Sequence, residues 1–417
     1  MTRDELIAAN SLVVGMGQSG LAALRLLREH GGRPAATDVK PLEEMPGIAK
    51  ALEDLGVPFA VQSPAVFAGR DLIVLSPGVP ADLEVLREAR RRGAKVIGEV
   101  ELAGYFLKGK ILGITGSNGK TTTTALTGHI LREAGIPVQV GGNIGWPPTS
   151  MAASSRADQW NVLELSSFQL ETIEQCRVHI AAVLNVTPDH LDRHGSMEAY
   201  AAAKRRIFER QQAGDVAVLN ADDALCARFA RELRSEPVWF SSSQRVERGL
   251  TLDGERVLYH GELLIETRDI PLRGRHNVEN VMAAAAAARS AGAPLGAIAA
   301  AIRAFPGVEH RLEYVRTVSG VDYFNDSKAT NVDATRKAID AFGGRLWVIL
   351  GGKDKDSDYT VLREPLAAKA RGALLIGAAA AKISAQLGDA VPRIPCGGLE
   401  SAVAEAQPGE MIAFAPG

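Results

Sequence analysis

The chain has 417 residues, with 47 lysines and arginines against 49 aspartates and glutamates, and a formal net charge of −2. At roughly 150 residues per domain, this length predicts about three domains, each large enough for its own hydrophobic core. The near-neutral charge gives no basic footprint that would indicate general nucleic-acid or membrane-surface binding. The three cysteines, Cys176, Cys226 and Cys396, are too widely spaced for a disulfide scaffold or a zinc ribbon, and they indicate a reducing compartment.

No apolar segment of the kind found in secretory signals occurs at the N-terminus. The most apolar stretch, 281–305, is mostly alanine and is interrupted by Arg289, Gly292, Pro294 and Arg303. A membrane span needs about 20 consecutive apolar residues. We therefore expect two packed helices joined by a Gly-Ala-Pro turn, in a soluble, cytoplasmic protein.

Short β-branched runs alternate with longer helical patterns along the chain, which is typical of βαβ units and parallel sheets. Three series are expected, with boundaries near residues 98–110 and 305–311, and no strand pattern joins the first series to the second. The first series has predicted strands Ser11–Gly15 and Asp71–Leu75 and a predicted helix Leu21–His30. The second has strands Lys110–Thr115, Asn161–Leu165 and Ile180–Val186 and a helix Met197–Arg210. The third has strands Val321–Phe324, Arg345–Leu350, Gly372–Ile376 and Met411–Phe414.

A glycine-rich turn, Gly15–Gly20, lies between the first strand and the first helix, and Asp38 follows at the end of the next strand. Glycines in such a turn let the backbone approach a phosphate at a helix N-terminus, and the carboxylate can accept a ribose hydroxyl. One alternative is a tight turn that needs glycine for its own geometry. Another is the nicotinamide site of an oxidoreductase, which the absence of a downstream hydride-transfer site disfavours.

A second strand-to-helix turn spans Thr115–Thr122, with the sequence TGSNGKTT. Backbone N–H groups in such a turn cradle phosphates, Lys120 brings positive charge to the β and γ oxygens, and Thr121 can reach a Mg²⁺ ion. The strict P-loop has glycine five positions before its Gly-Lys pair, whereas Ile114 stands there in this chain. We still expect a phosphate site, because Gly-Lys-Thr-Thr opens a helix directly after an apolar strand.

Polar residues also follow two later strands of the second series: Glu164 after one, and after the other Asn185, Thr187, Asp189, His190 and Asp192. Ligands of open α/β sheets bind beyond the carboxyl ends of the strands, where these residues are expected. Glu164 and His190 can complete the coordination of Mg²⁺, which combines few protein ligands with waters and phosphates. His190 also fits a hydrogen-bonding loop residue, and the two aspartates fit helix caps or solvated side chains.

The third series has a polar strand-to-helix turn at Asn325–Asn331, which contains more polar residues than capping needs. Gly351–Lys355 occupies the same position after the next strand. Lysines in these turns can hold an anionic substrate group, although an exposed run of charges is the alternative. At the second boundary, His310-Arg311 places an arginine from which a nucleotide can be reached.

Taken in order, these motifs resemble the Mur ligases, ATP-dependent amide-bond-forming enzymes of peptidoglycan synthesis. The segments that carry the resemblance span nearly the whole chain: GITGSNGKTTT (113–123), GGNIG (141–145), ELSSFQLE (164–171), NVTPDHLDRH (185–194), AAKRRIF (202–208), GRHNVENVMAA (274–284), EHRLE (309–313) and NDSKATN (325–331). ELSSFQLE and DSKATN favour the D-glutamate-adding member over other Mur ligases and folylpolyglutamate synthases.

The resemblance implies an α/β fold of three domains. These would be a Rossmann-like domain for the UDP-linked substrate (1–99), a central P-loop ATPase-like domain that binds ATP (100–307), and a Rossmann-like α/β domain for the incoming amino acid (308–417). The implied reaction adds D-glutamate to UDP-N-acetylmuramoyl-L-alanine through an acyl phosphate, with ATP and two Mg²⁺ ions, and closure of the third domain would exclude water. The resemblance also implies a cytoplasmic monomer with no nucleic-acid or membrane partner.

Individual site residues follow from the resemblance by position. For ATP they are Gly116, Ser117, Asn118, Gly119, Lys120, Thr121, Thr122, Asn280, Arg311 and Asp326. For the UDP-linked substrate they are Gln18, Ser19, Asp38, Gly78, Asn143 and Ser166, and for the amino acid Lys328, Thr330 and Lys355. The implied metal ligands are Thr121, Glu164, His190 and a carbamylated Lys204, and the implied catalytic residues are Lys120, Glu164, His190 and Lys204. From the sequence by itself, Lys204 is one charge on a basic helix.

The chain departs from the family pattern at its C-terminal end, where it stops at Phe414-Ala415-Pro416-Gly417 after an apolar strand. Family members continue into a segment with serine and phenylalanine that binds the D-glutamate carboxylates, followed by a closing helix. We expect a truncated chain, and the alternative is a ligase that lacks part of its amino-acid site. A ligase for another amino acid and a non-catalytic nucleotide-binding scaffold remain as further alternatives.

Overall fold

The structure, a computed structural model, describes residues 1–353, 357–405 and 411–414. It forms two compact units, one made of residues 1–251 with 283–298 and the other of residues 252–282 with the described part of 299–417. Among the helices of the described residues, none is both long and apolar enough to cross a membrane.

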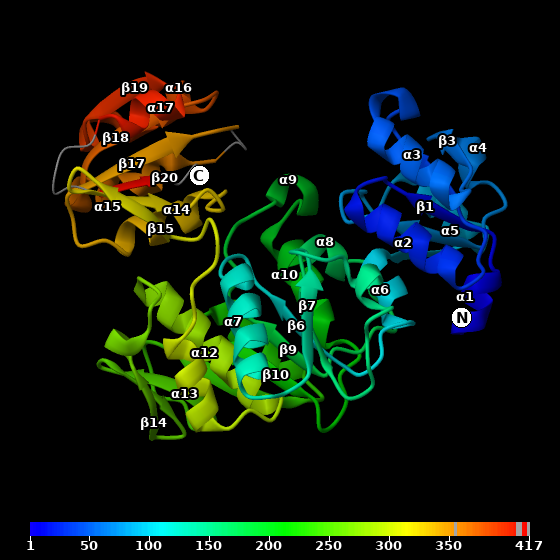
Figure 1. Ribbon diagram of the computed structural model, residues 1–417, viewed down its shortest axis with the longest axis horizontal. Helices are drawn as coiled ribbons and strands as arrows, with labels where there is room; N and C mark the ends of the chain where they lie inside the picture. Colours follow the sequence, from blue (N-terminus) through cyan, green and yellow to red (C-terminus); the bar gives the residue numbers. More distant parts are fainter. Residues whose placement is uncertain (354–356, 406–410, 415–417) are drawn as a thin grey trace. The chain divides into compact units, whose positions relative to one another are not determined.

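The first sheet lies in the N-terminal part of the first unit and is parallel, with the strand order β3-β2-β1-β4-β5 (Figure 1). Val13 packs with the helices of one face, and Leu12 and Val14 pack with those of the other, so the sheet is covered on both sides. Its elements are α1 (Arg3–Ala8), β1 (Ser11–Val14), α2 (Gln18–Glu29), β2 (Ala35–Asp38), the 3₁₀ turn η1 (Leu42–Glu44), α3 (Pro46–Leu55), β3 (Phe59–Val61), α4 (Pro64–Phe67), β4 (Leu72–Leu75), α5 (Glu84–Arg91), β5 (Lys95–Gly98) and α6 (Glu99–Gly104).

Helix α6 leads out of this sheet and is anchored by two buried glutamates. The carboxylate of Glu101 accepts hydrogen bonds from the backbone N–H groups of residues 174–176. One carboxyl oxygen of Glu99 accepts hydrogen bonds from the backbone N–H and the hydroxyl of Thr149, each 2.6 Å long, and the other oxygen has no partner. Burial raises the pKa of Glu99 to about 7, against which the two Thr149 hydrogen bonds act.

This buried carboxyl predicts a pH-dependent stability. Glu99 is protonated in the folded chain below about pH 7, whereas in the unfolded chain it ionises near its ordinary value of 4.5. Its contribution to the free energy of unfolding is therefore complete below pH 4.5 and is lost as the pH rises to 7, by roughly 3 kcal/mol. A Glu99→Gln variant cannot ionise at this position. Its free energy of unfolding, measured with denaturant at pH 5 and pH 8, should therefore fall less between these pH values than that of wild type. Parallel pH profiles of the two proteins would contradict the assignment.

The second sheet has the parallel strand order β12-β11-β10-β9-β6-β8-β7 in the first unit. Ala181 and Val183 of β9 pack with residues of α8, α10 and α11 on one face. The elements are β6 (Lys110–Thr115), α7 (Lys120–Glu133), β7 (Val138–Gly142), η2 (Pro148–Met151), β8 (Trp160–Glu164), α8 (Ser167–Leu170), β9 (Ile180–Val183), α9 (Leu191–His194), α10 (Met197–Arg205), η3 (Arg206–Phe208), β10 (Val216–Asn220), α11 (Ala224–Phe229), η4 (Ala230–Glu232), β11 (Glu236–Ser241) and β12 (Gly249–Asp253).

The second unit contains an antiparallel hairpin, β13 (Arg256–Tyr259) with β14 (Glu262–Glu266), and a mixed sheet of order β15-β16-β20-β17-β18-β19 in which β15 is antiparallel to β16. Helices α12 (Arg275–Ser290) and α13 (Leu295–Arg303), which the two units share, follow η5 (Thr267–Asp269). The sheet elements are β15 (Glu313–Val318), β16 (Val321–Asn325), α14 (Val332–Asp340), β17 (Leu346–Gly351), η6 (Tyr359–Leu362), α15 (Arg363–Lys369), β18 (Ala370–Ile376), α16 (Ala380–Leu387), η7 (Gly388–Ala390), β19 (Arg393–Gly397), α17 (Leu399–Val403) and β20 (Met411–Phe414).

Most predicted elements are confirmed to within a few residues, including the helix pair around the Gly-Ala-Pro turn. Two predictions are too long. The strand expected over 180–186 ends at Val183, because Asn185 turns to accept a hydrogen bond from Ser117 N–H with its carbonyl oxygen at 2.9 Å. The helix expected over 197–210 ends at Arg205 and continues as a 3₁₀ turn, which buries Ile207 and Phe208.

Candidate nucleotide and substrate site

The turn between β6 and α7 requires glycine at two positions. Gly116 has φ +155° and Gly119 has φ +85°, a backbone region that other residues rarely adopt. A Cβ atom on Gly116 would also lie 3.0 Å from the Cβ atom of Leu184. This geometry opens the N-terminus of α7, where backbone N–H groups and the helix dipole favour an anion.

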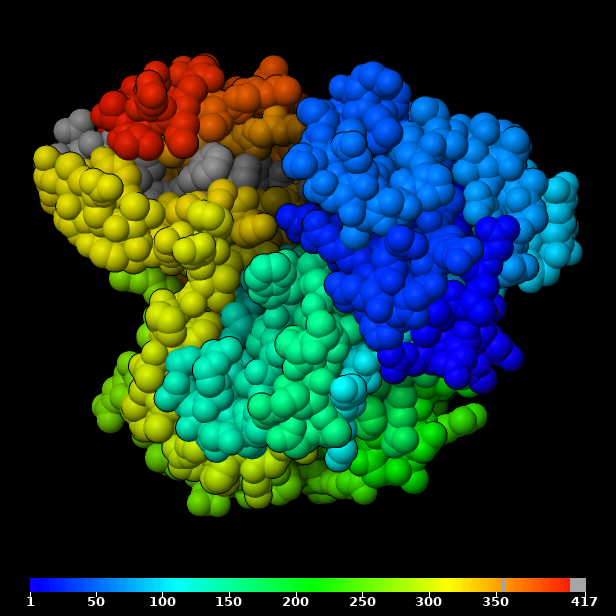
Figure 2. All heavy atoms as spheres, turned by 45° about the vertical axis from the view of Figure 1, so that its right-hand side comes forward, coloured from blue at the N-terminus to red at the C-terminus, as the bar shows by residue number. Residues whose placement is uncertain are grey.

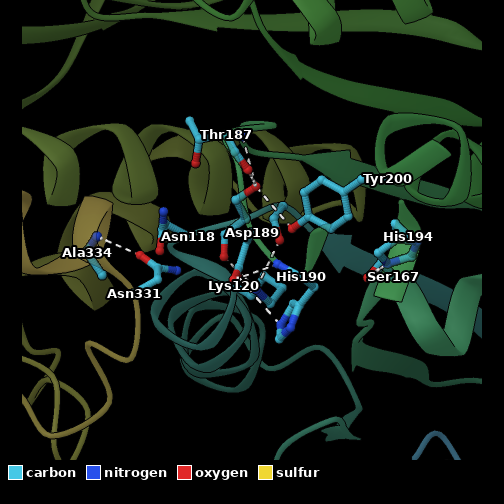
Figure 3. A network of polar contacts seen from close by, with 12 residues as sticks. Asn118, Lys120, Ser167, Thr187, Asp189, His190, His194, Tyr200, Asn331 and Ala334 are labelled. Atoms are coloured by element: carbon cyan, nitrogen blue, oxygen red, sulfur yellow. Dashed lines mark hydrogen bonds and ion pairs between the residues drawn. The ribbon is translucent and has the colours of Figure 1, made fainter. Parts of the chain in front are cut away.

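The same turn is held by residues that follow β9 (Figure 3). Asn185 accepts a hydrogen bond from Asn118 N–H at 2.8 Å and returns one from its amide to the Asn118 carbonyl at 3.1 Å. Ser117 donates from its hydroxyl to the Thr187 carbonyl at 2.8 Å and accepts from Thr187 N–H at 2.9 Å. The Ser117 hydroxyl also lies 3.1 Å from the Tyr200 hydroxyl. The turn is therefore preorganised by hydrogen bonds within the protein.

Two lysine ammonium groups meet at one backbone carbonyl of this turn. Lys120 Nζ donates to the Gly116 carbonyl at 3.0 Å and to the Ser117 carbonyl at 2.8 Å, and Lys204 Nζ donates to the Gly116 carbonyl at 2.8 Å. Only 1% of Lys204 is exposed, and its Nζ lies 4.4 Å from the centre of the Tyr200 ring. Burial, followed by the neighbouring charge of Lys120, lowers the pKa of Lys204 well below its ordinary value. The structure thus places Lys204 inside the site.

Glu164 is the last residue of β8 and is buried beside the turn's own strand, β6. One of its carboxylate oxygens accepts a hydrogen bond from the Asn143 amide at 3.0 Å, and the other has no hydrogen-bond partner. A buried carboxylate oxygen that accepts no hydrogen bond is costly in an apolar environment, and a bound cation would stabilise it. The structure therefore brings together Asn143 and Glu164, which the sequence had assigned to different ligands.

His190 and Ser166 lie at the starts of short helices. His190 has φ +52°, its side chain is 42% exposed, and its ring makes an edge contact with Phe168 at 4.9 Å between centroids. Ser166 caps α8 by accepting a hydrogen bond from Gln169 N–H at 3.3 Å. His190 is thus accessible to a ligand, and Ser166 is half-buried and already serves the helix.

Ser167, His194 and Glu171 stand in the order of a hydrolase triad, but Ser167 and His194 are too buried to act as parts of one. His194 Nε2 lies 2.9 Å from the Ser167 hydroxyl, and its Nδ1 lies 3.3 Å from a Glu171 carboxylate oxygen. Burial, with the charges of Lys204 and Arg193, lowers the pKa of His194 to about 4, so its ring is neutral at neutral pH. Ser167 is 3% exposed, which leaves no access for an acyl substrate. The network instead holds α9 against α8.

In the N-terminal part, the predicted residues gather around the first glycine-rich turn. Asp38 accepts hydrogen bonds from Met16 N–H at 2.7 Å and from Lys40 N–H at 3.0 Å, so its carboxylate already orders this turn. Gln18 and Ser19 form the first turn of α2, and Gly78 is exposed in the loop after β4. These four candidate residues for the UDP-linked substrate therefore share one edge of this sheet.

In the second unit, Arg311 and Asp326 are close together. Arg311 donates to the Lys328 carbonyl at 2.8 Å, and Asp326 accepts from Leu312 N–H at 3.2 Å. Burial raises the pKa of Asp326 to about 6, against the charge of Arg311. The other predicted residues of this unit differ in burial. Asn280 is buried and its amide donates to the Asn277 side chain. Lys328 and Thr330 are exposed, and Lys355 lies outside the described residues.

A ready-made metal cage is absent from the described ranges, since no three His, Cys, Asp or Glu side chains there are grouped to hold an ion. Tyr200, Arg193 and Asp223 also support the site, although no sequence motif predicted a role for them. Asp223 accepts from Val186 N–H at 2.8 Å and caps α11, so it fixes the segment that clamps the glycine turn. It follows β10, and polar residues after that strand were the signal that could have revealed it.

Comparison with family models and known proteins identifies the family of the chain. Residues 9–98 match the MurD-like N-terminal domain of Mur ligases, residues 114–288 the Mur ligase middle domain, and residues 310–417 the Mur ligase glutamate ligase domain. A UDP-N-acetylmuramoylalanine--D-glutamate ligase from Solibacter usitatus is 61% identical, over 99% of this chain and 93% of that protein. The chain belongs to the Mur ligase family.

A second relative supports this membership, and two solved structures share the fold. The ligase of the same name from Acidobacterium capsulatum is 49% identical over 99% of this chain and 92% of that protein. The solved MurC structure from Thermotoga maritima has a TM-score of 0.63 and 20% identity, over 97% of this chain and 95% of that chain. MurF from Acinetobacter baumannii has a TM-score of 0.63 and 16% identity, over 97% and 90%. These two structures confirm the three-domain α/β fold of Mur ligases, which the resemblance had implied.

Proposed function

We propose that this Mur ligase joins D-glutamate to UDP-N-acetylmuramoyl-L-alanine at the expense of ATP, through an acyl phosphate, in the synthesis of peptidoglycan precursors. The observation that carries the proposal is the 61% identity, over 99% of the chain, with a ligase of that name. The preorganised turn at Gly116–Gly119, with Lys120 at its end, supports the use of ATP. We further propose a cytoplasmic monomer.

The proposed division of labour follows the three sheets. Residues 1–99 bind the UDP-linked substrate through Gln18, Ser19, Asp38 and Gly78, residues 100–307 bind ATP, and residues 308–417 bring the amino acid. Asn143 and Ser166 are proposed to contact the UDP-linked substrate from the central domain. In the second unit, Asn280, Arg311 and Asp326 are assigned to ATP, and Lys328, Thr330 and Lys355 to the amino acid.

Magnesium fits the residues of the central site. The unpartnered oxygen of Glu164, the half-buried Thr121 and the accessible His190 are the candidate ligands, with Lys204 as a carbamate. So few protein ligands suit Mg²⁺, which keeps waters and phosphates in its coordination sphere. When bound, the ions neutralise charge on the phosphate oxygens.

Two steps make up the proposed reaction. The carboxylate of the UDP-linked substrate attacks the γ-phosphorus of ATP, and ADP leaves; the D-glutamate amine then attacks the acyl carbon, and phosphate leaves. Both steps gather negative charge on oxygens, so the protein contributes positioning and electrostatic stabilisation instead of a nucleophile. In this scheme the Lys120 ammonium leaves its two carbonyl acceptors and moves to the phosphate oxygens.

The test is phosphate release from Mg-ATP with UDP-N-acetylmuramoyl-L-alanine, with and without D-glutamate. The proposal expects release that requires both substrates, together with a product heavier by one glutamyl residue in mass spectrometry. Release with a different amino acid only would assign the chain to another member of the family. ATP binding without release under any combination would overturn the proposed activity in favour of a scaffold.

A further inference from the structure

Arg193 of α9 reaches out of the central sheet to the loop that follows β4 in the N-terminal sheet. One terminal nitrogen of its guanidinium donates to the carbonyl oxygens of Pro77 at 3.2 Å and Gly78 at 3.4 Å, and the other donates to the Val79 carbonyl at 3.1 Å. Three successive carbonyls therefore point at one cation. A guanidinium offers five N–H donors in a rigid plane, so it can serve all three at once.

The central domain also contacts this guanidinium. Its central carbon lies 4.0 Å from the centre of the Phe168 ring, and a terminal nitrogen lies 3.5 Å from a Glu171 carboxylate oxygen. His194, the next residue, holds α9 to α8 through Ser167 and Glu171. The side chain of Arg193 is 19% exposed and has little freedom to leave.

The loop that Arg193 holds is packed against the first glycine-rich turn. The Ser76 hydroxyl donates to the Gly15 carbonyl at 2.7 Å. A Cβ atom on Gly15 would lie 2.9 Å from a methyl carbon of Val79 and 3.1 Å from the Cβ atom of Ser76. Because the two segments touch this closely, a displacement of the loop displaces the turn.

Beside Arg193 lies a hollow of about 610 Å³, lined from the N-terminal domain by Asp82 and Arg87 and from the central domain by Arg206 and Glu209. The two domains also touch elsewhere: Lys95 Nζ lies 3.2 Å from a Glu174 carboxylate oxygen, and Figure 2 shows blue N-terminal atoms against cyan and green ones. At the loop itself, the hydrogen bonds from Arg193 link the two domains.

We propose that Arg193 is a positioning residue that holds the 77–79 loop, and through it the Gly15–Gly20 turn, in the conformation that binds the UDP-linked substrate. It acts on the substrate through the loop, whose backbone carbonyls accept its hydrogen bonds. The inference rests on the proposed function, since that function assigns the UDP-linked substrate to this turn. It predicts that substitution of Arg193 weakens the binding of the UDP-linked substrate and leaves the binding of ATP and D-glutamate largely unchanged.

The test compares Arg193→Ala and Arg193→Lys with wild type, and uses Arg87→Ala as the matched control. Arg87 is an exposed arginine on the same hollow and pairs with Glu84. Calorimetry with UDP-N-acetylmuramoyl-L-alanine in the absence of ATP gives Kd, and steady-state kinetics gives KM for each substrate and kcat. Circular dichroism and Tm check the fold of each variant.

In both Arg193 variants, Kd and KM for the UDP-linked substrate should rise about tenfold or more, because charge-assisted hydrogen bonds to the loop are lost. The KM for ATP and the kcat at saturation should stay within about threefold of wild type, since binding of one substrate is affected and not the chemistry. Lysine keeps the charge but cannot donate to three carbonyls in one plane, so Arg193→Lys should recover only part of the affinity. Arg87→Ala should match wild type.

An unchanged KM for the UDP-linked substrate in Arg193→Ala would overturn the inference. Equal losses toward all three substrates, with a lowered Tm, would also overturn it, because they indicate a purely structural role. If Arg193→Ala does not fold, Arg193→Lys decides by the same criteria. Failure of the wild-type chain to bind UDP-N-acetylmuramoyl-L-alanine would instead overturn the proposed function.

Discussion

Replacement of Lys204 by methionine is expected to reduce ligase turnover by about 100-fold or more while the chain keeps its fold, since the loss removes charge stabilisation at the reacting phosphates. Methionine has a similar length and is apolar, so it suits a side chain that is 1% exposed. The Gly116 carbonyl keeps its hydrogen bond from Lys120 at 3.0 Å. A buried amine is costly, so the free energy of unfolding should stay level or increase.

The chemical reason for the loss is the proposed carbamate on Lys204. Because burial and the Lys120 charge lower the pKa of Lys204, its amine is neutral over more of the pH range and can attack CO₂. The nitrogen forms a bond to the carbon of CO₂ and one proton leaves to solvent, which turns a cation into an oxygen ligand. A carbamate signal in ¹³C NMR with labelled bicarbonate, present in wild type and absent in Lys204→Met, tests this step. Full turnover by the variant would contradict both the carbamate and the two-metal proposal.

Replacement of Lys120 by methionine is expected to lower kcat by about 1,000-fold, because this ammonium is placed to stabilise charge on the transferred phosphate. Its Nζ rests on the Gly116 and Ser117 carbonyls at 3.0 and 2.8 Å, at the mouth of the turn. Lys110→Met is the matched control, because Lys110 is an exposed lysine on the preceding strand, whose Nζ lies 5.5 Å from the centre of the Trp160 ring. That variant should retain wild-type kinetics.

The kinetic pattern of Lys120→Met distinguishes two roles. A fall in kcat indicates stabilisation in the transition state, whereas a higher KM for ATP with unchanged kcat indicates equal binding of ground and transition states and would contradict the assignment. The Lys120→Met variant also tests how the Lys120 charge affects the carbamylation of Lys204. Since the Lys120 charge is one cause of the lowered pKa of Lys204, its removal should leave less Lys204 carbamylated at a given pH.

Much of the site was visible in the sequence because it lies in local turns. The turn at Gly116–Gly119, the carboxylate at Glu164 and the polar segment after β9 each occupy the end of a parallel strand, and such ends share one edge of a sheet. The order of the strands within each sheet could not be predicted from such local turns. That β6 lies between β8 and β9 follows from long-range pairing, which no local pattern encodes.

Lys204 and Arg193 are two residues whose contacts could not be predicted from the local sequence. In the sequence, Lys204 is a basic residue on a helix with other basic residues, and Arg193 is one charge in a polar segment. The fold turns Lys204 inward, so that its Nζ reaches Gly116, 88 residues earlier in the chain, and it brings Arg193 to Gly78, 115 residues earlier. Neither separation leaves a local signature.

The family, the α/β class and the turns that can hold phosphate could be predicted from the sequence, because glycine, lysine and capping residues act on the backbone within a few positions. Which charges are buried and which groups share a partner is visible only in the folded chain. Two ammonium groups at one carbonyl, a carboxylate oxygen without a donor and an arginine across three carbonyls arise from packing between distant segments. Burial and shared partners set the energies of such groups, and these depend on the whole fold.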